Sequence, residues 1–273
     1  MTGTYIRKPV VAGSFYPQDA NSISEQIRSF QPQNDDKFDA IAALLPHAGY
    51  QYSGRVAVTT ANKLNLKDTI ILLGPNHTGR GESASIVTNG KWQTPLGEIE
   101  IDSLFAGCLR ERCAFLKNDT YAHAYEHSLE VELPILQYFK SDFKIVPIVF
   151  MIDDFSVLVE VGNCLAQVIQ DLRRKDSVLI IASSDMTHYE SYEEAAKKDN
   201  LAIQEILELN VSGLVKKVFQ YKISMCGWMP TVVMLTAAKK LGATGGRLIL
   251  YETSAAVTQD YGSVVGYAGI IIN

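Results

Sequence analysis

Three histidines in this chain come directly after apolar, strand-like runs. His47 ends the run IAALLPH, His77 ends IILLGPNH, and His188 ends LIIASSDMTH, which also contains Asp185. In an open α/β sheet, the carboxyl ends of the parallel strands lie along one edge, and ligands bind there. Imidazole is the commonest metal ligand in proteins and also titrates near neutral pH. The spacing therefore predicts one site where these side chains meet and either bind a metal ion or transfer protons.

Cys226 is the thiol best placed to join that site. It lies in KISMCGWMPTVVML, just before a predicted helix, and a thiol near a helix amino terminus has a lowered pKa that favours the thiolate. Together with His47 and His77 it would form a His₂Cys donor set, which admits Fe(II), Cu or Zn. For the other thiols, a buried structural role is the better interpretation; they are Cys108, Cys113 and Cys164.

Asp185 and His188 form a D-x-x-H pair after the strand-like run LIIASS. The functional interpretation makes His188 an acid–base group, with Asp185 orienting it or accepting a proton. The structural alternative makes Asp185 a helix cap or turn residue and His188 a solvated neighbour.

The segment AYEHSLEVELP offers further polar side chains, but their roles stay open at this point. Glu126, His127 and Glu130 can support the metal ligands through hydrogen bonds, or they can be the charged start of a helix. His123 is expected to be exposed. A metal-independent hydrolase with Cys226 as nucleophile and His188 as base is a further hypothesis, although it leaves the histidines after the first two strands without roles.

The elements that must position these residues alternate between strand and helix. Continuous apolar runs without strict alternation indicate strands buried on both faces; they lie at 40–45, 69–73, 145–150, 178–183, 247–251 and 264–272. Helical patterns occur between them, at 53–65, 128–140, 155–172, 195–207 and 228–241, and 84–101 indicates a hairpin. The pattern predicts a single α/β domain over 1–273, with a mostly parallel central sheet flanked by helices.

Composition narrows the class of protein. The 273 residues are 47% hydrophobic and carry a net charge of −5, and no basic stripe suited to nucleic acid occurs. No apolar run approaches the ~18–20 residues of a membrane helix, and the first twenty residues do not resemble a signal peptide. Four cysteines without CxxC spacing predict reduced thiols. We therefore expect a cytoplasmic protein that binds neither nucleic acid nor membranes.

A series of motifs along nearly the whole chain resembles the Memo family, which is also described as protein B of the AmmeMemoRadiSam set. The motifs are RKPVVAGSFYP (7–17), LLPHAGYQYSG (44–54), LLGPNHTG (72–79), TPLGEIEID (94–102), EHSLEVELP (126–134), SSDMTHY (183–189), MCG (225–227) and GSVVGYAG (262–269).

This resemblance implies a fold similar to that of the class III extradiol nonheme-iron dioxygenases. It implies that His47, His77 and Cys226 occupy the metal-site positions, with Asp185 and His188 lining the same pocket. Those dioxygenases use two histidines and a carboxylate, whereas the Memo pattern has a cysteine in the carboxylate's place. The family pattern CGRHP reads CGWMP here, so the resemblance implies a more apolar pocket mouth at 228–229.

Two functions follow from the resemblance. One is a dioxygenase-like, metal-dependent oxidoreductase that contains nonheme iron or copper and acts on an unknown small molecule, in concert with radical-SAM and Ammecr-type partner proteins. The other is a non-catalytic metal- or peptide-binding adaptor that retains a dioxygenase-like pocket.

Overall fold

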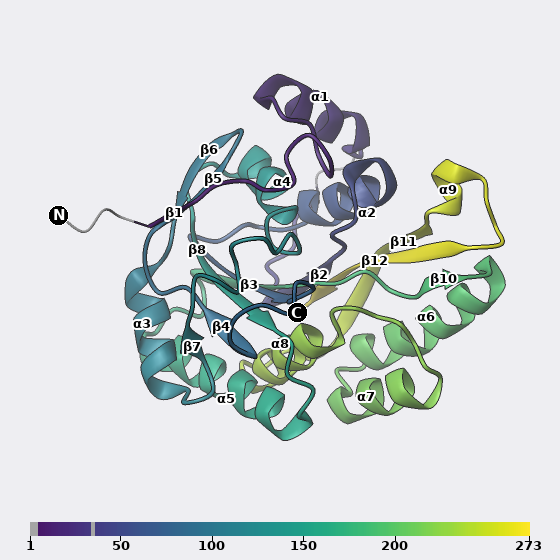
Figure 1. The fold of residues 1–273 in the computed structure, drawn as a ribbon. Coiled ribbons are helices and arrows are strands. Elements are labelled where there is room, and N and C mark those ends of the chain that lie inside the picture. The colour runs from purple at the N-terminus through teal and green to yellow at the C-terminus, as the bar shows by residue number, and fades with distance from the viewer. Residues whose placement is uncertain (1–4, 34–35) are drawn as a thin grey trace.

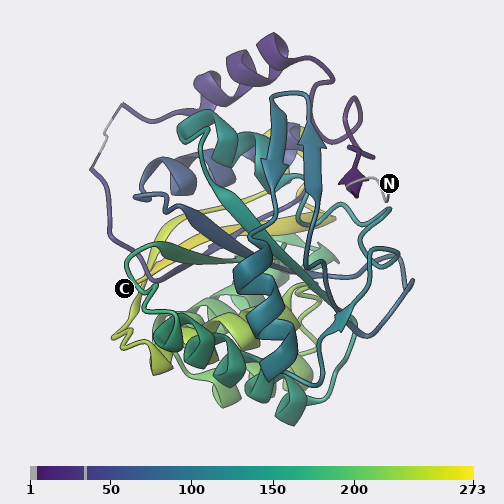
Figure 2. The same cartoon turned by 90° about the vertical axis from the view of Figure 1, so that its left-hand side faces the viewer.

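The structure, a computed structural model, describes residues 5–33 and 36–273, and a twisted central sheet crosses the molecule (Figures 1 and 2). Its strands are β2 (Ala42–Leu45), β3 (Thr69–Pro75), β4 (Ala84–Ile86), β7 (Lys117–Asn118), β8 (Lys144–Phe150), β9 (Val178–Ser183), β10 (His188–Glu190), β11 (Gly246–Thr253) and β12 (Val264–Ile272). Within the described residues the order is β10-β12-β2-β9-β3-β8-β4-β7, and β11 pairs with β12.

The middle of this sheet is parallel. Strands β2, β9, β3 and β8 run in the same direction, and Ala182 of β9 is level with both Leu44 and Leu73. The turns that follow these strands therefore begin at one edge. Antiparallel pairing is confined to the flanks, where β12 joins β2, β10 and β11, and β4 joins β8. The predicted single α/β domain with a mostly parallel central sheet is confirmed.

Helices cover both faces of the sheet (Figure 1). One face carries α1 (Ala20–Phe30), α2 (Tyr50–Asn62) and α4 (Glu132–Phe139). The other carries α8 (Trp228–Lys240), with α3 (Ser103–Arg112), α5 (Phe155–Asp171), α6 (Tyr192–Leu207) and α7 (Val211–Gln220) around it. The short α9 (Ala255–Thr258) connects β11 and β12. No described helix combines the length and apolar composition that crossing a membrane requires.

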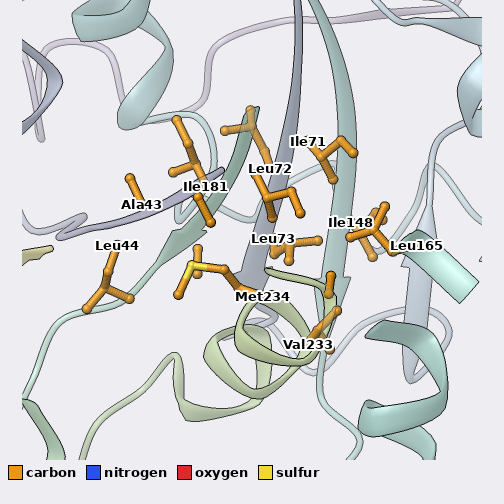
Figure 3. Close-up of a cluster of buried hydrophobic side chains, with 14 of the residues drawn as sticks. Ala43, Leu44, Ile71, Leu72, Leu73, Ile148, Leu165, Ile181, Val233 and Met234 are labelled. Atoms are coloured by element: carbon orange, nitrogen blue, oxygen red, sulfur yellow. The ribbon is translucent and has the colours of Figure 1, made fainter. Parts of the chain in front are cut away.

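The main core lies between the sheet and the helix layer of α5 and α8. Figure 3 shows side chains of four strands together with those of the two helices, and the side chains that it labels are completely buried. Neighbouring strand residues, such as Leu72 and Leu73, point to opposite faces of the sheet. Each large aliphatic side chain buried in this way contributes about 1.5–3 kcal/mol. They include Leu44, Leu72, Leu73, Ile148, Ile181, Leu165, Val233 and Met234.

A separate small sheet brings the amino-terminal segment to the edge of the molecule. The predicted hairpin is formed by β5 (Lys91–Thr94) and β6 (Gly97–Glu100), and β1 (Ile6–Arg7) pairs with β5 in parallel. This pairing positions Arg7 beside the turns that precede α4. The strand β4 joins the main sheet instead of the hairpin.

Two helices begin at residues other than those predicted. Helix α2 starts at Tyr50, earlier than expected, and its first N–H donates to the carbonyl oxygen of Phe15. Helix α4 starts only at Glu132, because turns occupy residues 119–131. As a result, His127 and Glu130 do not share the helix face that the sequence suggests.

Candidate metal centre

Turns at one edge of the sheet carry the side chains that the sequence singles out. His47 follows β2 and His77 follows β3, two strands that flank β9. Asp185 lies in the turn after β9, and Cys226 comes just before α8, which packs against all three strands. Donor atoms of His47, His77 and Cys226 lie within 4.8 Å of one another, so the fold brings together three side chains that can hold a metal ion.

The spacing of these donors suits a transition-metal ion. Sγ of Cys226 lies 3.4 Å from Nε2 of His47, and the rings of His47 and His77 have centroids 5.2 Å apart. Metal bonds of about 2.3 Å to sulfur and about 2.0 Å to nitrogen, set at a tetrahedral angle, place the two donor atoms about 3.5 Å apart. The observed separation of sulfur and nitrogen therefore fits a shared ion.

Hydrogen bonds hold the ring of His47 with Nε2 toward the sulfur. Its Nδ1 lies 2.9 Å from the hydroxyl oxygen of Ser183, and its backbone N–H donates to Oδ1 of Asp185 over 2.9 Å. The N–H of Ala48 donates to the same carboxylate oxygen. Burial lowers the pKa of His47 well below its ordinary value, so the imidazole is neutral and can act as a ligand.

Glu126 holds the second imidazole. Its Oε1 lies 2.9 Å from Nδ1 of His77, and its Oε2 accepts the backbone N–H of the same residue. Burial acts to raise the pKa of Glu126, but the contacts with His77, the N–H of Ser128 and the nearby His127 together outweigh it and lower the pKa to about 2. A carboxylate on one ring nitrogen fixes the tautomer and leaves the other nitrogen free for a metal. Sequence reasoning left this role open.

A second group of donor atoms, from His77, Glu126 and His127, also lies within 4.8 Å. However, Oε1 of Glu126 already accepts hydrogen bonds from His77 Nδ1 and from the N–H groups of His127 and Ser128. A metal ion there would have to displace these donors. Glu126 is therefore better suited to shaping the turn than to binding a metal. The ring of His127 stacks on that of His77, with centroids 4.7 Å apart.

The thiol of Cys226 differs from the sequence-based prediction. Burial, followed by the nearby Asp185, raises its pKa above the ordinary value, so the expected thiolate is wrong for the metal-free chain. Hydrogen bonds with backbone groups and with the Ser184 hydroxyl act to lower this pKa, but they do not offset the desolvation. The thiol instead lies beside the neutral Nε2 of His47, and a metal ion that binds here has to displace the thiol proton.

Asp185 and His188 have partners other than each other. Asp185 bonds to backbone N–H groups at His47 and Ala48, and burial raises its pKa to about 6. Nδ1 of His188 lies 2.9 Å from the carbonyl oxygen of Ser224. Because that oxygen can only accept, Nδ1 carries a proton, and Nε2 is the ring nitrogen that can offer a lone pair. The carbonyl of Ser224 thus sets the tautomer that Asp185 was expected to set.

A cavity of about 590 Å³ opens beside these groups. The described side chains around it include two carboxylates and several aromatic rings, and its lining contains His47, His77, His127, Asp185, His188, Phe15, Tyr52, Tyr189, Asp260 and Tyr267. Trp228 and Met229, which were expected at its mouth, pack against the hydrophobic core instead. The cavity gives a small ligand access to His47, His77 and His188.

Arg7 holds the turns that carry Glu126. Its guanidinium group donates to the carbonyl oxygens of His123 and Glu126 over 2.7 and 2.6 Å, and pairs with Glu130 over 2.7 Å. Its plane lies over the ring of Trp92, 4.3 Å from the centroid. Glu130 also accepts the Tyr16 hydroxyl. The buried ion pair therefore ties β1 to the turn beside His77.

His123 is completely buried within these turns, and the prediction that it is exposed is wrong. Arg7 draws the backbone of His123 inward through the carbonyl group, which the sequence pattern does not reveal. Nε2 of His123 lies 3.3 Å from the carbonyl oxygen of Ser85. Burial lowers the pKa of His123 to about 3.

The buried imidazole of His123 is expected to make the protein less stable in acid. The unfolded chain binds a proton at His123 below about pH 6.5, whereas the folded chain does not until about pH 3. The contribution of His123 to the free energy of unfolding is therefore complete above pH 6.5. As the pH falls below that value, about 1.4 kcal/mol of this free energy is lost per pH unit. Urea unfolding at several pH values measures this effect. Between pH 7.5 and 5, the free energy of unfolding should fall by about 2 kcal/mol less in His123→Gln than in the native chain. If the free energy of unfolding depended on pH in the same way in the native chain and in His123→Gln, this prediction would be wrong.

Known proteins resemble this chain over almost its full length. Residues 7–271 match the family described as Memo-like protein. The chain is 41% identical to a MEMO1 family protein of Methanopyrus kandleri, over 97% of this chain and 98% of the relative. It is 42% identical to relatives from Aquifex aeolicus, over 97% and 98%, and from Methanosarcina mazei, over 98% and 99%.

Proposed function

The chain belongs to the Memo-like protein family, and from that premise we propose that it binds one transition-metal ion through His47, His77 and Cys226 and uses it in redox chemistry. The observation that carries the proposal is the 3.4 Å separation between Sγ of Cys226 and Nε2 of His47. In addition, Nδ1 of each imidazole already has another partner, so both rings can offer Nε2.

The donor set favours a metal that accepts a soft ligand. A thiolate beside two imidazoles suits Cu, Zn or Fe(II) better than Mg²⁺ or Ca²⁺. When bound, iron or copper would supply electron transfer and would polarise a ligand in the cavity. We propose iron or copper for the redox function, with zinc as the redox-inactive alternative. The radical-SAM and Ammecr-type partner proteins are proposed on family membership alone.

The chain's own residues would handle protons beside the metal. Nε2 is the nitrogen of His188 that can accept a proton, because Nδ1 donates its own proton to Ser224, and both His188 and Asp185 line the cavity. A group with a pKa of about 6, as at Asp185, exchanges protons readily near neutral pH. We propose His188 as the base that accepts a proton from the ligand, and Asp185 as a second proton carrier.

Metal titration and oxygen uptake test this function. We expect one Fe(II), Cu(I) or Zn²⁺ ion per chain under anaerobic conditions. With ascorbate as the reductant, the iron- or copper-loaded chain should consume oxygen faster than the free ion does. His188→Gln should keep the metal stoichiometry but slow oxygen uptake by about 100-fold or more, because it removes an acid–base group. A chain that binds no metal would contradict the proposal.

An adaptor is the second candidate function. Tyr189 lines the cavity although 78% of its surface is exposed, and exposed aromatic side chains often anchor a protein partner. In that case the loaded chain would bind metal without consuming oxygen faster than the free ion.

A further inference from the structure

The hydroxyl group of Ser183 has three hydrogen-bonding partners. Its oxygen lies 2.9 Å from Nδ1 of His47, 2.7 Å from the carbonyl oxygen of Ser128 and 2.9 Å from Oε1 of Glu132. A hydroxyl group donates one proton and accepts through two lone pairs. With three partners, the group therefore donates to one of them and accepts from the other two.

The carbonyl oxygen of Ser128 determines the direction of these bonds, because it can only accept. A 2.7 Å contact between two oxygens without a shared proton would press lone pairs against each other, whereas this distance is typical of an O–H···O hydrogen bond. Ser183 therefore donates to Ser128. It follows that Nδ1 of His47 and Oε1 of Glu132 both donate to Ser183, so both atoms carry a proton.

The surroundings of Glu132 are consistent with an uncharged side chain. Glu132 is completely buried in the first turn of α4, and its Oε2 has no hydrogen-bond partner among the described residues. The titratable groups that interact with it are Asp185 and Tyr50, which bring no positive charge. Burial raises the pKa of Glu132 well above its ordinary value. An ionised carboxylate without a cation is strongly disfavoured in such a place.

We propose that Glu132 is a positioning residue that remains an uncharged carboxylic acid in the folded chain and, through Ser183, holds His47 in the tautomer with its proton on Nδ1. Among the described residues, the structure records no hydrogen bond from Glu132 to a candidate metal ligand, and a single hydroxyl group connects it to His47. These hydrogen bonds exist without a metal ion. Only the consequence for metal affinity rests on the function proposed above.

Infrared spectroscopy of the native, metal-free chain tests the protonation state directly. At neutral pH we expect a carbonyl band from a protonated carboxylic acid, above the amide I band. Selective ¹³C labelling of glutamate carboxyl groups should shift this band, which separates it from the aspartates. The band should be missing from Glu132→Gln. A native spectrum without a glutamic acid band would overturn the proposal, and this measurement does not depend on whether any variant folds.

The pH dependence of unfolding gives a second test. The unfolded chain releases the Glu132 proton above its ordinary pKa of about 4.3, whereas the folded chain keeps it. Glu132 should therefore contribute a loss of stability as the pH rises from about 5 to 7, raising the unfolding constant by about tenfold per pH unit. This contribution is opposite in sign to that of His123 over the same range, so it is measured as the difference between the native chain and Glu132→Gln. Glu132→Gln should lack this contribution, and Glu98→Gln, at an exposed carboxylate of β6, should keep it. Parallel curves for the native chain and Glu132→Gln would overturn the proposal.

Zinc affinity shows the consequence for the metal ligands. Glu132→Gln should change the Zn²⁺ dissociation constant by less than about threefold, because no charge is lost and the amide N–H can donate to Ser183. Ser183→Ala should weaken Zn²⁺ binding by about 10–100-fold, because His47 loses its partner. An equal loss in both variants would mean that Glu132 carried a charge and would overturn the proposal. A native chain that binds no Zn²⁺ would contradict the metal site while leaving the infrared result valid.

Discussion

Cys226→Ser is expected to weaken metal binding by more than about 100-fold. Loss of a residue that merely hydrogen-bonds to a metal ligand already costs about 10–100-fold, and this change removes a ligand itself. Serine keeps the size of the side chain, but its hydroxyl does not ionise near neutral pH and is a poor donor for copper or zinc. Competition titrations with chelators of known affinity for Cu(I) and Zn²⁺ measure the effect.

Cys108→Ser is the matched control for this experiment. Cys108 lies on α3 and lines a different cavity, with Arg112 and Asp171, so its replacement should leave the affinity unchanged. Circular dichroism of both metal-free variants establishes that they are folded. Unchanged affinity in Cys226→Ser, or an equal loss in both variants, would show that the thiol before α8 does not bind the metal.

Arg7→Met is expected to lower the free energy of unfolding by about 3–5 kcal/mol. Removing one member of a buried ion pair leaves the other charged and without its counter-ion, and Glu130 is completely buried. The change also removes the donors to the carbonyl groups of His123 and Glu126. Since a domain of this kind is stable by only about 5–15 kcal/mol, urea unfolding will show a large shift of the midpoint.

An exposed arginine provides the comparison for this experiment. Arg55 pairs with Glu252 on the surface, where such pairs contribute about 0–1 kcal/mol, so Arg55→Met should barely move the midpoint. If Arg7→Met shifted the urea midpoint as little as Arg55→Met does, the ion pair with Glu130 would not be the contact that holds β1 to the turns at 123–130.

Continuous apolar runs predicted six strands of the main sheet, but not the short β4, β7 and β10. Through β2 and β3 they predicted the meeting of His47 and His77. This succeeded because parallel strands that are buried on both faces must be apolar along their whole length, and their ends must share an edge. Cys226 was identified by its place before a helix, but the direction of its pKa shift was wrong, since burial depends on packing that local sequence does not encode.

Most hydrogen-bonding partners of these ligands could not be predicted from the sequence. Ser183, Ser224 and Arg7 act through contacts between distant segments, and such contacts depend on loop conformation, which has no periodic signal. The turns at 119–131 illustrate this, because a helical pattern from 128 onward hid both the late start of α4 and the burial of His123. Glu126 is adjacent to His127 in the sequence, yet the imidazole that lies within 2.9 Å of its carboxylate is that of His77.

The order of strands in the sheet also has a consequence for synthesis on the ribosome. Strand β2 is bordered by β9 and β12, which leave the exit tunnel well over a hundred residues later. Pairings so distant along the chain close slowly. We therefore expect the strand that precedes His47 to stay unpaired until translation is nearly finished. The candidate metal ligands would then come together only in the last stage of folding.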